Sequence, residues 1–336
     1  MKPDGTVGVA VLGLGFMGRT HIAAYRAAEA RSPNRLVAVC DSNSERRAGR
    51  AGAAGNLEAT VGDELMFDPS SLHAYAEPAD LFADPEVDLI SICTHTDSHV
   101  DLAIAAIEAG KHVLVEKPVA TNAKDVERLA AAVKQSGTLC MPAHCMRFWP
   151  GWDWLHECIV SGEFGKVRSA AFRRLGSPPS WSKDFYTDSK RSGGALIDLH
   201  IHDADFIRWC FGEPNEVSCA GTLDHLTCFY RFDDGPAHVV AEGGWDHSPG
   251  FPFQMRYVVA FDEATAEFDL SREPPLMLTK AGETCAVKLP EGDGYLGEVQ
   301  HLIDLIRSGG SELRCTIEDA ANLAHMLDLE RDQLLR

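Results

Sequence analysis

A glycine-rich turn follows an apolar segment near the start of the chain. Residues 7–12 contain no polar side chain, and Gly13, Gly15 and Gly18 follow with the spacing GxGxxG. A continuously apolar run is typical of a strand that is buried on both faces of a parallel sheet. At this spacing the first glycine permits a tight turn, the second lets the backbone approach a pyrophosphate, and the third lets a helix pack closely on the strand. The pattern therefore predicts a dinucleotide site at a helix N-terminus.

An acidic residue stands at the end of the second apolar run. Residues 36–40 end in Asp41, which lies 23 residues beyond Gly18. An acid at about this distance accepts hydrogen bonds from the ribose hydroxyls and repels a 2′-phosphate, so the sequence favours NAD over NADP. Two alternatives stay open: Asp41 can be an ordinary turn residue at the strand end, and Arg46 or Arg47 can turn toward a phosphate.

The bulk composition limits the partners. A net charge of −19 argues against nucleic acid and against an anionic membrane surface. Residues 1–6 lead directly into the first strand, and no apolar run reaches the roughly 20 residues of a membrane helix. The ten cysteines show no CxxC spacing. We therefore expect reduced thiols and a cytoplasmic protein.

The order of patterns along the 336 residues indicates two domains. Strands and helices alternate from residue 7 to 141, which predicts a doubly wound parallel sheet, the Rossmann fold, with right-handed crossovers. Beyond Arg147, alternating segments and helices predict an α+β domain on a mixed, mostly antiparallel open sheet. We expect a dinucleotide-binding domain over 1–143 and a domain for substrate binding and oligomerisation over 144–336. An uncovered apolar sheet face favours a homodimer or homotetramer.

The expected elements follow from these patterns. In the first domain we expect strands at 7–12, 36–40, 87–93, 111–116 and 138–141, and helices from 42 to about 54 and at 78–83, 99–109 and 121–136. In the second we expect strands at 166–172, 227–232, 237–241, 256–261 and 285–289, and helices at 196–210, 297–308 and 317–335. Residues 55–75 show no clean periodicity.

The first catalytic candidate is Glu116-Lys117-Pro118. It stands at the C-terminal end of a predicted parallel strand, where open α/β sheets bind their ligands. Pro118 restricts Lys117 to an extended backbone. The Lys117 ammonium group could donate to a substrate oxygen or to the nicotinamide carboxamide. The alternative is a surface lysine that follows a strand.

The second candidate lies on the helix predicted over 196–210. Asp198, His202 and Asp205 are spaced i, i+4 and i+7 and share one helix face, whereas His200 falls on nearly the opposite side. An imidazole that titrates near neutral pH, with a carboxylate to position the substrate, suits the interconversion of an alcohol and a carbonyl. The alternative to a catalytic pair is that Asp198 is a carboxylate of the first helical turn and His202 a histidine packed in the core.

Two other chemistries have weaker support. His200, His202, Asp203 and His247 could be considered as metal ligands, but neither HExxH nor a Cys/His cluster with ligand spacing is present, so we expect no metal. Cys145 could be considered as a nucleophile. Nothing identifies its base, and a buried structural thiol is the simpler interpretation.

Together these motifs resemble the glucose–fructose oxidoreductase and inositol dehydrogenase (Gfo/Idh/MocA) family of NAD(P)-dependent oxidoreductases. The resemblance extends over nearly the whole chain. It rests on residues 13–18 with His21, 94–99, 109–113, 116–118, 147–148, 193–196 with Asp198 and His202, and Tyr295 with Glu298. The chain departs from the family pattern in a longer segment at 55–75 and in His200.

The resemblance implies a catalytic set of Lys117, Asp198 and His202, with His202 as the proton-transfer group. The cofactor contacts it implies are Gly13, Gly15, Phe16, Met17, Gly18, Asp41, Thr94, His95, His99, Glu116 and Lys117. The substrate contacts it implies are Arg147, Trp181, Asp198 and His202, and Trp152, Trp154 and Trp181 could offer apolar faces to sugar C–H groups.

The implied reaction is hydride transfer between NAD and a secondary alcohol of a sugar, cyclitol or related polyol. Two other functions stay open. One is a glycoside hydrolase or lyase of the same fold that retains NAD, and the other is a non-catalytic dinucleotide-binding regulator.

Overall fold

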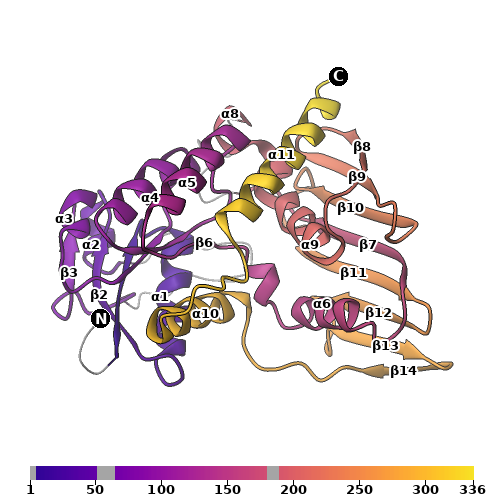
Figure 1. The fold of residues 1–336 in the computed structure, drawn as a ribbon, viewed down its shortest axis with the longest axis horizontal. Helices are drawn as coiled ribbons and strands as arrows, with labels where there is room; N and C mark the ends of the chain where they lie inside the picture. Colours follow the sequence, from indigo (N-terminus) through magenta and orange to yellow (C-terminus); the bar gives the residue numbers. More distant parts are fainter. Residues whose placement is uncertain (1–4, 51–64, 180–188) are drawn as a thin grey trace. The chain divides into compact units, whose positions relative to one another are not determined.

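The computed structural model describes residues 5–50, 65–179 and 189–336, which form two compact units (Figure 1). Unit 1 comprises residues 1–145 and 293–322, and unit 2 comprises 146–292 and 323–336. The division after residue 145 lies close to the one expected from the sequence. Residues 293–322 were expected in the second domain, but they pack with unit 1.

Unit 1 is built on a six-stranded parallel sheet with the strand order β3-β2-β1-β4-β5-β6. This is the doubly wound arrangement that the sequence predicted. Its strands are β1 (Val7–Leu12), β2 (Asn34–Cys40), β3 (His73–Tyr75), β4 (Leu89–Ile92), β5 (His112–Val115) and β6 (Cys140–Pro142). The residues of β1 and β4 are all buried, as expected for strands covered on both faces.

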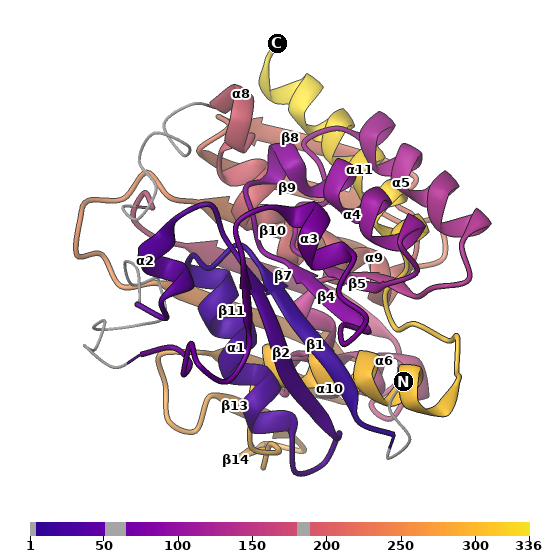
Figure 2. The ribbon, with the colours of Figure 1, turned by 90° about the vertical axis from the view of Figure 1, so that its left-hand side faces the viewer.

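Helices cover both faces of this sheet. Figures 1 and 2 show α1 and α10 on one side and α3, α4 and α5 on the other. The helices are α1 (Phe16–Ala28), α2 (Ser44–Arg47), α3 (Pro78–Phe82), α4 (His99–Glu108), α5 (Ala123–Gln135) and α10 (Gly294–Ser308), with a short 3₁₀ turn η1 (Thr96–Ser98). The helix expected from 42 to about 54 is wrong in its extent, because α2 ends at Arg47; residues 51–54 lie outside the described residues.

Unit 2 is built on a mixed eight-stranded sheet with the strand order β14-β13-β12-β11-β7-β10-β9-β8. Only β7 and β10 pair in parallel, and every other neighbouring pair is antiparallel. The strands are β7 (Val167–Leu175), β8 (Glu216–Gly221), β9 (His225–Arg231), β10 (His238–Gly244), β11 (Gln254–Phe261), β12 (Ala264–Asp269), β13 (Leu276–Lys280) and β14 (Glu283–Ala286). The sequence patterns missed β3 in unit 1 and β8, β12 and β13 here.

Helices lie on one face of the second sheet and leave the other open (Figure 1). They are the 3₁₀ turn η2 (Cys145–Phe148), α6 (Trp152–Ser161), α8 (Ser189–Ser192), the π-helical turn η3 (Leu196–His200), α9 (Ile201–Phe211) and the end of α11 (Ile317–Leu334). Helix α6 was also missed. Trp152 is fully buried and meets the rings of Phe172, Phe206 and Tyr257 at centroid distances of 5.7, 4.8 and 5.3 Å. Trp152 therefore belongs to the core of unit 2, and the interpretation of it as a face for sugar is wrong.

The cysteines differ from the expectation in one pair. Cys219 on β8 and Cys228 on β9 lie directly opposite each other and form a disulfide. The remaining eight cysteines are free thiols. The expectation that all ten are reduced is therefore wrong. Strand register brought these two together, which spacing along the sequence did not indicate.

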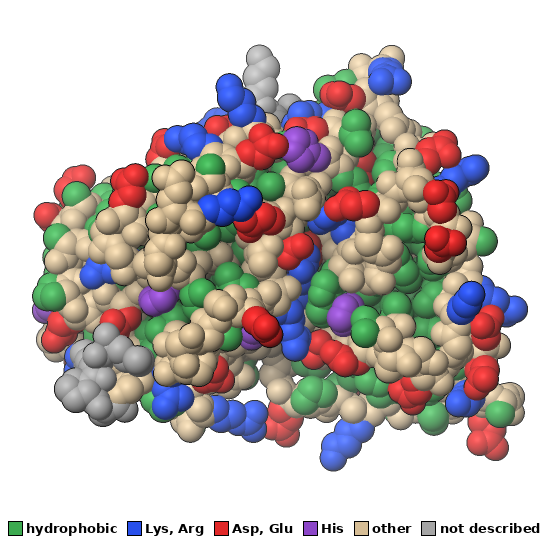
Figure 3. Space-filling model, in the orientation of Figure 1, with side chains coloured by type: hydrophobic (Ala, Val, Ile, Leu, Met, Phe, Trp, Pro, Cys, Tyr) green, Lys and Arg blue, Asp and Glu red, His purple; other side chains and the backbone are tan. Residues whose placement is uncertain are grey.

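No helix within 5–50, 65–179 and 189–336 combines the length and the apolar character that crossing a bilayer requires. On the face shown in Figure 3, basic and acidic side chains are interspersed.

Candidate active site

The glycine turn joins β1 to α1 in unit 1. Gly13 has φ +90°, and a Cβ there would lie 2.7 Å from the backbone of Cys93. A Cβ at Gly18 would lie 2.0 Å from the carbonyl oxygen of Gly13. Packing within the protein therefore requires the first and third glycines. A Cβ at Gly15 would meet no atom of residues 5–50, 65–179 or 189–336 within 4 Å, and Gly15 caps α1 without a side-chain hydrogen bond, so among these residues the helix N-terminus is open there. That open space fits a pyrophosphate.

Asp41 joins the end of β2 to this turn. Its Oδ2 accepts a hydrogen bond from the backbone N–H of Leu14 at 2.7 Å, and its Oδ1 accepts from that of Asn43 at 2.8 Å. The guanidinium of Arg46 lies 3.5 Å from Oδ2, whereas Arg47 donates to the backbone oxygen of Asp41. The carboxylate is 8 % exposed and thus has a structural role beside any contact with ribose.

A buried polar network adjoins Lys117, which follows β5. His21 Nε2 lies 2.8 Å from Glu116 and 3.8 Å from Glu298. Glu116 Oε2 accepts a hydrogen bond from the backbone N–H of Lys117 at 3.0 Å. On its other side, the His21 ring lies 3.0 Å from the hydroxyl of Ser91. The network therefore holds the backbone at Lys117, and the Lys117 side chain is half-buried.

The two carboxyl groups of this network titrate differently. Burial raises the pKa of Glu298 well above its ordinary value, and the charge of Glu116 raises it further. Burial also opposes ionisation of Glu116. The hydrogen bond from His21 and the charges of His21 and Lys117 outweigh that burial, so the pKa of Glu116 lies below its ordinary value. The two shifts run in opposite directions, so Glu116 ionises more readily than Glu298.

The other predicted cofactor residues in unit 1 differ in exposure. Phe16, Met17 and Thr94 are half-buried and His95 is exposed. His99 is buried, and its ring nitrogens lie 2.9 Å from the carbonyl oxygen of Pro118 and 3.0 Å from that of Thr94. Burial lowers the pKa of His99, and in its neutral form the ring can donate to only one of these two carbonyl oxygens.

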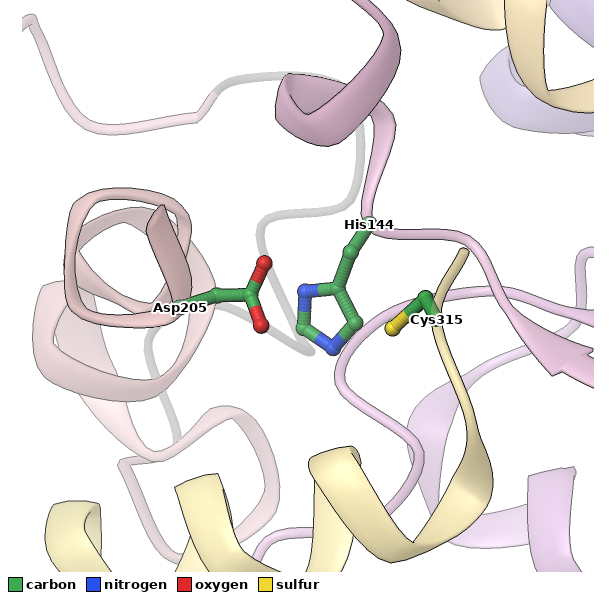
Figure 4. A group of neighbouring side chains, drawn as sticks. All are labelled: His144, Asp205 and Cys315. Carbon is green, nitrogen blue, oxygen red and sulfur yellow. The ribbon is translucent and has the colours of Figure 1, made fainter. Parts of the chain in front are cut away.

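The end of unit 1 encloses a second group of side chains. His144 and Cys315 face each other in Figure 4, with an imidazole nitrogen and the thiol within 4.8 Å. They are 2 % and 0 % exposed, and the neighbouring Cys145 is 4 % exposed. This enclosure supports the interpretation of Cys145 as a structural thiol.

In unit 2, one helical segment carries the other two predicted catalytic residues. Residues 194–208 are buried except for Asp198 and His202, which are half-buried. The segment passes through the π-helical turn η3 before α9 begins at Ile201, and such turns are frequent at functional sites. The segment therefore exposes only the two side chains that the sequence assigned to catalysis.

Buried ion pairs hold this helix in place. Asp203 accepts two hydrogen bonds from Arg174 at 2.9 and 3.2 Å. Asp205 accepts two from Arg147 at 2.7 and 2.9 Å. Asp205 was expected to share a face with His202; it is fully buried, whereas His202 is half-buried. Arg147 is 3 % exposed, and its observed contact with Asp205 is structural. That Arg147 binds substrate stays a prediction. Trp181 lies outside the described residues.

His200 belongs to a separate buried cluster. Its Nε2 lies 3.0 Å from the hydroxyl of Tyr230 and 3.3 Å from Glu330, and Tyr230 donates to Glu330 at 2.9 Å. All three side chains are fully buried. His200 therefore connects the helix to β9 and α11. Sequence reasoning missed Tyr230 and Glu330, because a partner 130 residues away leaves no local signal.

Comparison with known proteins identifies the family. Residues 7–144 match the model of an oxidoreductase family with an NAD-binding Rossmann fold, and residues 152–267 match the model of the GFO/IDH/MocA C-terminal domain. The chain belongs to the Gfo/Idh/MocA family. It is thus an oxidoreductase with an NAD-binding domain, as the sequence motifs predicted.

Named relatives and solved structures agree with this assignment. The chain is 28% identical over 257 residues to a myo-inositol 2-dehydrogenase of Thermotoga maritima, covering 70% of this chain and 74% of that protein. It is 28% identical over 269 residues to an NAD⁺-dependent scyllo-inositol 2-dehydrogenase of Bacillus subtilis, covering 74% and 75%. A levoglucosan dehydrogenase solved with NADH and levoglucosan superposes with a TM-score of 0.81 at 21% identity, covering 98% of this chain and 97% of that chain. At that identity the structural likeness shows the fold alone.

The Glu298→Gln substitution is expected to change how stability depends on pH. Below about pH 4.3 the carboxyl group is protonated in both folded and unfolded chains. As pH rises toward the raised folded pKa, only the unfolded chain ionises, so wild type loses stability by up to about 1.4 kcal/mol per pH unit. Glu298→Gln lacks this loss. The free energy of unfolding of the variant, measured in urea without NAD, should therefore increase relative to that of wild type as pH rises from 5 to 8.

Glu116→Gln is the matched control. The folded pKa of Glu116 is lowered, so its contribution to stability is present above the unfolded pKa and disappears as pH falls through the folded pKa. Glu116→Gln should therefore lower the free energy of unfolding at neutral pH, and lower it less in acid. A difference between Glu298→Gln and wild type that stays constant with pH would contradict the raised pKa of Glu298.

The Asp41→Asn substitution is expected to narrow a preference for NAD over NADP. Asparagine keeps one oxygen for the backbone N–H of Leu14 but removes the charge that would repel a 2′-phosphate. Hydrogen bonds to charged groups contribute about 1.5–3 kcal/mol, so the affinity ratio should narrow about tenfold or more. Fluorescence titration with both cofactors measures this ratio. Arg46→Gln is the companion variant, and a larger effect there than in Asp41→Asn would favour the alternative in which Arg46 contacts a phosphate.

Proposed function

We propose that this chain transfers a hydride between NAD and a secondary alcohol of a sugar, cyclitol or related polyol. The observation that carries the proposal is the pattern of exposure along residues 194–208, where only Asp198 and His202 reach the surface. An otherwise buried helix that exposes one carboxylate and one imidazole suits proton transfer to and from a hydroxyl group. The names of relatives that act on inositols support the substrate class.

Each residue of the proposed catalytic set has a distinct role. His202 takes the hydroxyl proton as the alcohol is oxidised, and returns it in the reverse direction. Asp198 accepts a hydrogen bond from a substrate hydroxyl or raises the basicity of the imidazole. Lys117 donates a hydrogen bond to the reacting oxygen of the substrate. Its ammonium group stabilises the negative charge that develops on this oxygen as the hydroxyl proton leaves.

The residues of unit 1 fit NAD. The open space beside Gly15 at the N-terminus of α1 suits the pyrophosphate, and Asp41 stands next to that turn for the ribose. Bound NAD supplies the hydride acceptor, so that loss of the hydroxyl proton and of the C–H hydride converts the alcohol carbon to a carbonyl.

A substrate screen tests the proposal. Purified protein with NAD is offered inositols, anhydro sugars, aldoses, sugar acids and amino sugars, and formation of NADH is followed by absorbance. NADH formation in proportion to substrate consumed supports a dehydrogenase. Release of the phenol from an aryl glycoside without net NADH would instead support a hydrolase that retains NAD. NAD binding without turnover of any compound would support a regulator.

His202→Ala should abolish most turnover, and His200→Ala should not. Loss of a general acid or base typically costs about 10²–10⁴-fold in rate. Because His202 is half-buried and lies on the other unit from the glycine turn, we expect its replacement to leave the thermal unfolding midpoint and the NAD affinity nearly unchanged.

The matched variant at His200 separates catalysis from structure. His200→Ala removes a fully buried contact with Tyr230, so we expect a loss of about 1–3 kcal/mol of stability with a smaller change in turnover. Stability comes from urea unfolding, and turnover is measured on the substrate found in the screen. A greater loss of turnover in His200→Ala than in His202→Ala would mean that the proton-transfer group is wrongly assigned.

We also propose a homo-oligomer that associates through the open face of the eight-stranded sheet. Strand register places an apolar row across four neighbouring strands on this face: Phe229, Val240, Ala171 and Val258. Val258 is 47% exposed. An apolar row of this kind tends to be buried against a copy of itself.

Val258→Glu should therefore weaken association. Light scattering at micromolar concentration should give a multiple of 36.6 kDa for wild type and a smaller mass for the variant. Val160→Glu is the control, since Val160 is also apolar and 68% exposed but lies on α6. A wild-type mass near 36.6 kDa would exclude the proposed assembly.

A further inference from the structure

Strand pairing in unit 2 brings together three side chains that could bind a metal ion. His225 begins β9, while Asp246 and His247 follow the end of β10, which pairs antiparallel with β9. His225 Nδ1 lies 2.7 Å from Asp246 Oδ1, and His247 Nδ1 lies 3.5 Å from the same oxygen. One ligand atom of each residue lies within 4.8 Å of the other two.

These separations suit a small divalent cation. Imidazole nitrogen and carboxylate oxygen bind zinc at about 2.0–2.2 Å, which places tetrahedral ligands about 3.4 Å apart. The two distances to Asp246 lie on either side of that value. Three protein ligands leave a fourth position for water, and the partial exposure of both histidines gives solvent access to it.

The far side of the His225 ring has the contacts typical of a metal-binding histidine. Its Nε2 lies 3.2 Å from Glu242 Oε1, and Glu242 Oε2 accepts a hydrogen bond from Arg173 at 2.6 Å. A carboxylate on the second ring nitrogen fixes the tautomer and the orientation of a metal ligand. With Glu242 so placed, His225 presents Nδ1 toward Asp246.

Packing holds both rings in place. A Cβ at Gly244 would lie 2.8 Å from Cγ of His225 and 2.9 Å from its Nδ1, so the ring rests directly on the backbone of β10. The His247 ring stacks on Phe251 with centroids 4.1 Å apart. Such pre-organisation lowers the entropic cost of binding an ion.

His247 gives an independent observation. Its Nδ1 is shielded from solvent and makes no hydrogen bond with any of the described residues. An ion pair between a protonated His225 and its two carboxylate neighbours accounts for His225, but it leaves this nitrogen of His247 without a hydrogen bond, 3.5 Å from Asp246. A cation between Asp246 and the two rings accounts for both histidines.

We propose that His225, Asp246 and His247 form a binding site for a divalent transition metal ion, with zinc favoured by the ligand set. The site uses none of the proposed catalytic residues. Its loops also support the helix that carries Asp198, because Leu196 donates a backbone hydrogen bond to Leu223 and Trp245 donates one to Asp224. Metal binding would therefore stabilise the start of that helix.

Zinc binding by the whole protein tests the site. The chain, without an affinity tag, is stripped with EDTA, dialysed and titrated with Zn²⁺ by calorimetry. Every protein carries Cys285→Ser, because Cys285 is an exposed free thiol that could itself bind zinc. We expect one ion per chain and a higher thermal unfolding midpoint with zinc. Co²⁺ in place of Zn²⁺ should give the visible absorption of a tetrahedral site.

Three variants and one control locate the ion. Asp246→Asn and His247→Ala each remove a ligand, and Gly244→Ala keeps all three ligands but displaces the His225 ring. Each should weaken zinc binding at least tenfold, in the range seen when groups that support a metal site are changed. His238→Ala removes an exposed histidine of β10 outside the cluster and should bind zinc as the parent does.

Circular dichroism checks the fold of each variant. Asp246→Asn is nearly isosteric at a side chain that is 55% exposed, so it keeps the test valid if Gly244→Ala does not fold. Absence of stoichiometric zinc binding in the parent, or equal binding in Asp246→Asn and the parent, would overturn the proposal. Because the readout is metal binding, either result leaves the proposed dehydrogenase activity to its own test.

Discussion

The arrangement of unit 2 depends on how the helical segment 196–211 buries its charges. Taking a carboxylate and a guanidinium out of water is costly unless each is paired with good geometry. Two ion pairs satisfy this condition through two hydrogen bonds each: Arg174 with Asp203, and Arg147 with Asp205. His200 adds a third buried contact, with Tyr230 and Glu330. Any rotation of the helix would break these buried contacts together. The helix is thereby fixed in the one orientation that leaves Asp198 and His202 at the surface.

In unit 1 the constraint is backbone packing. The carbonyl groups that approach Gly13 and Gly18 leave no room for a Cβ, whereas the space beside Gly15 is open. The turn is therefore rigid on the protein side and accessible at the helix N-terminus. Asp41 holds Leu14 of this turn from β2, and Glu116 holds the backbone of Lys117 from β5. Residues assigned to cofactor binding thus also maintain the loops at the carboxyl ends of the strands.

Local patterns predicted much of this fold, and long-range contacts account for most of the misses. Buried apolar runs and the glycine turn indicated the parallel sheet, and the helix expected at 99–109 matches α4, which Gly110 follows with φ +78°. The i, i+4 spacing correctly separated Asp198 and His202 from His200, although a π-helical turn lies within it. The same spacing did not indicate that Asp205 is buried against Arg147, because these residues are 58 positions apart in the sequence. Trp152 carries no sequence signal that distinguishes a core ring from a ligand-binding one.

Strand register explains why the most specific polar groups of unit 2 were not visible in the sequence. Cys219 and Cys228 are nine residues apart, and His225 and Asp246 are 21 apart. Neither spacing matches a motif, since motifs describe ligands on one helix or one loop. Pairing of β8 with β9 and of β9 with β10 sets each pair side by side, and Gly244 then decides how the His225 ring is oriented. In a sheet of this kind, chemistry is determined by which residues stand opposite each other, and that information lies in the pairing of strands rather than in the order of residues.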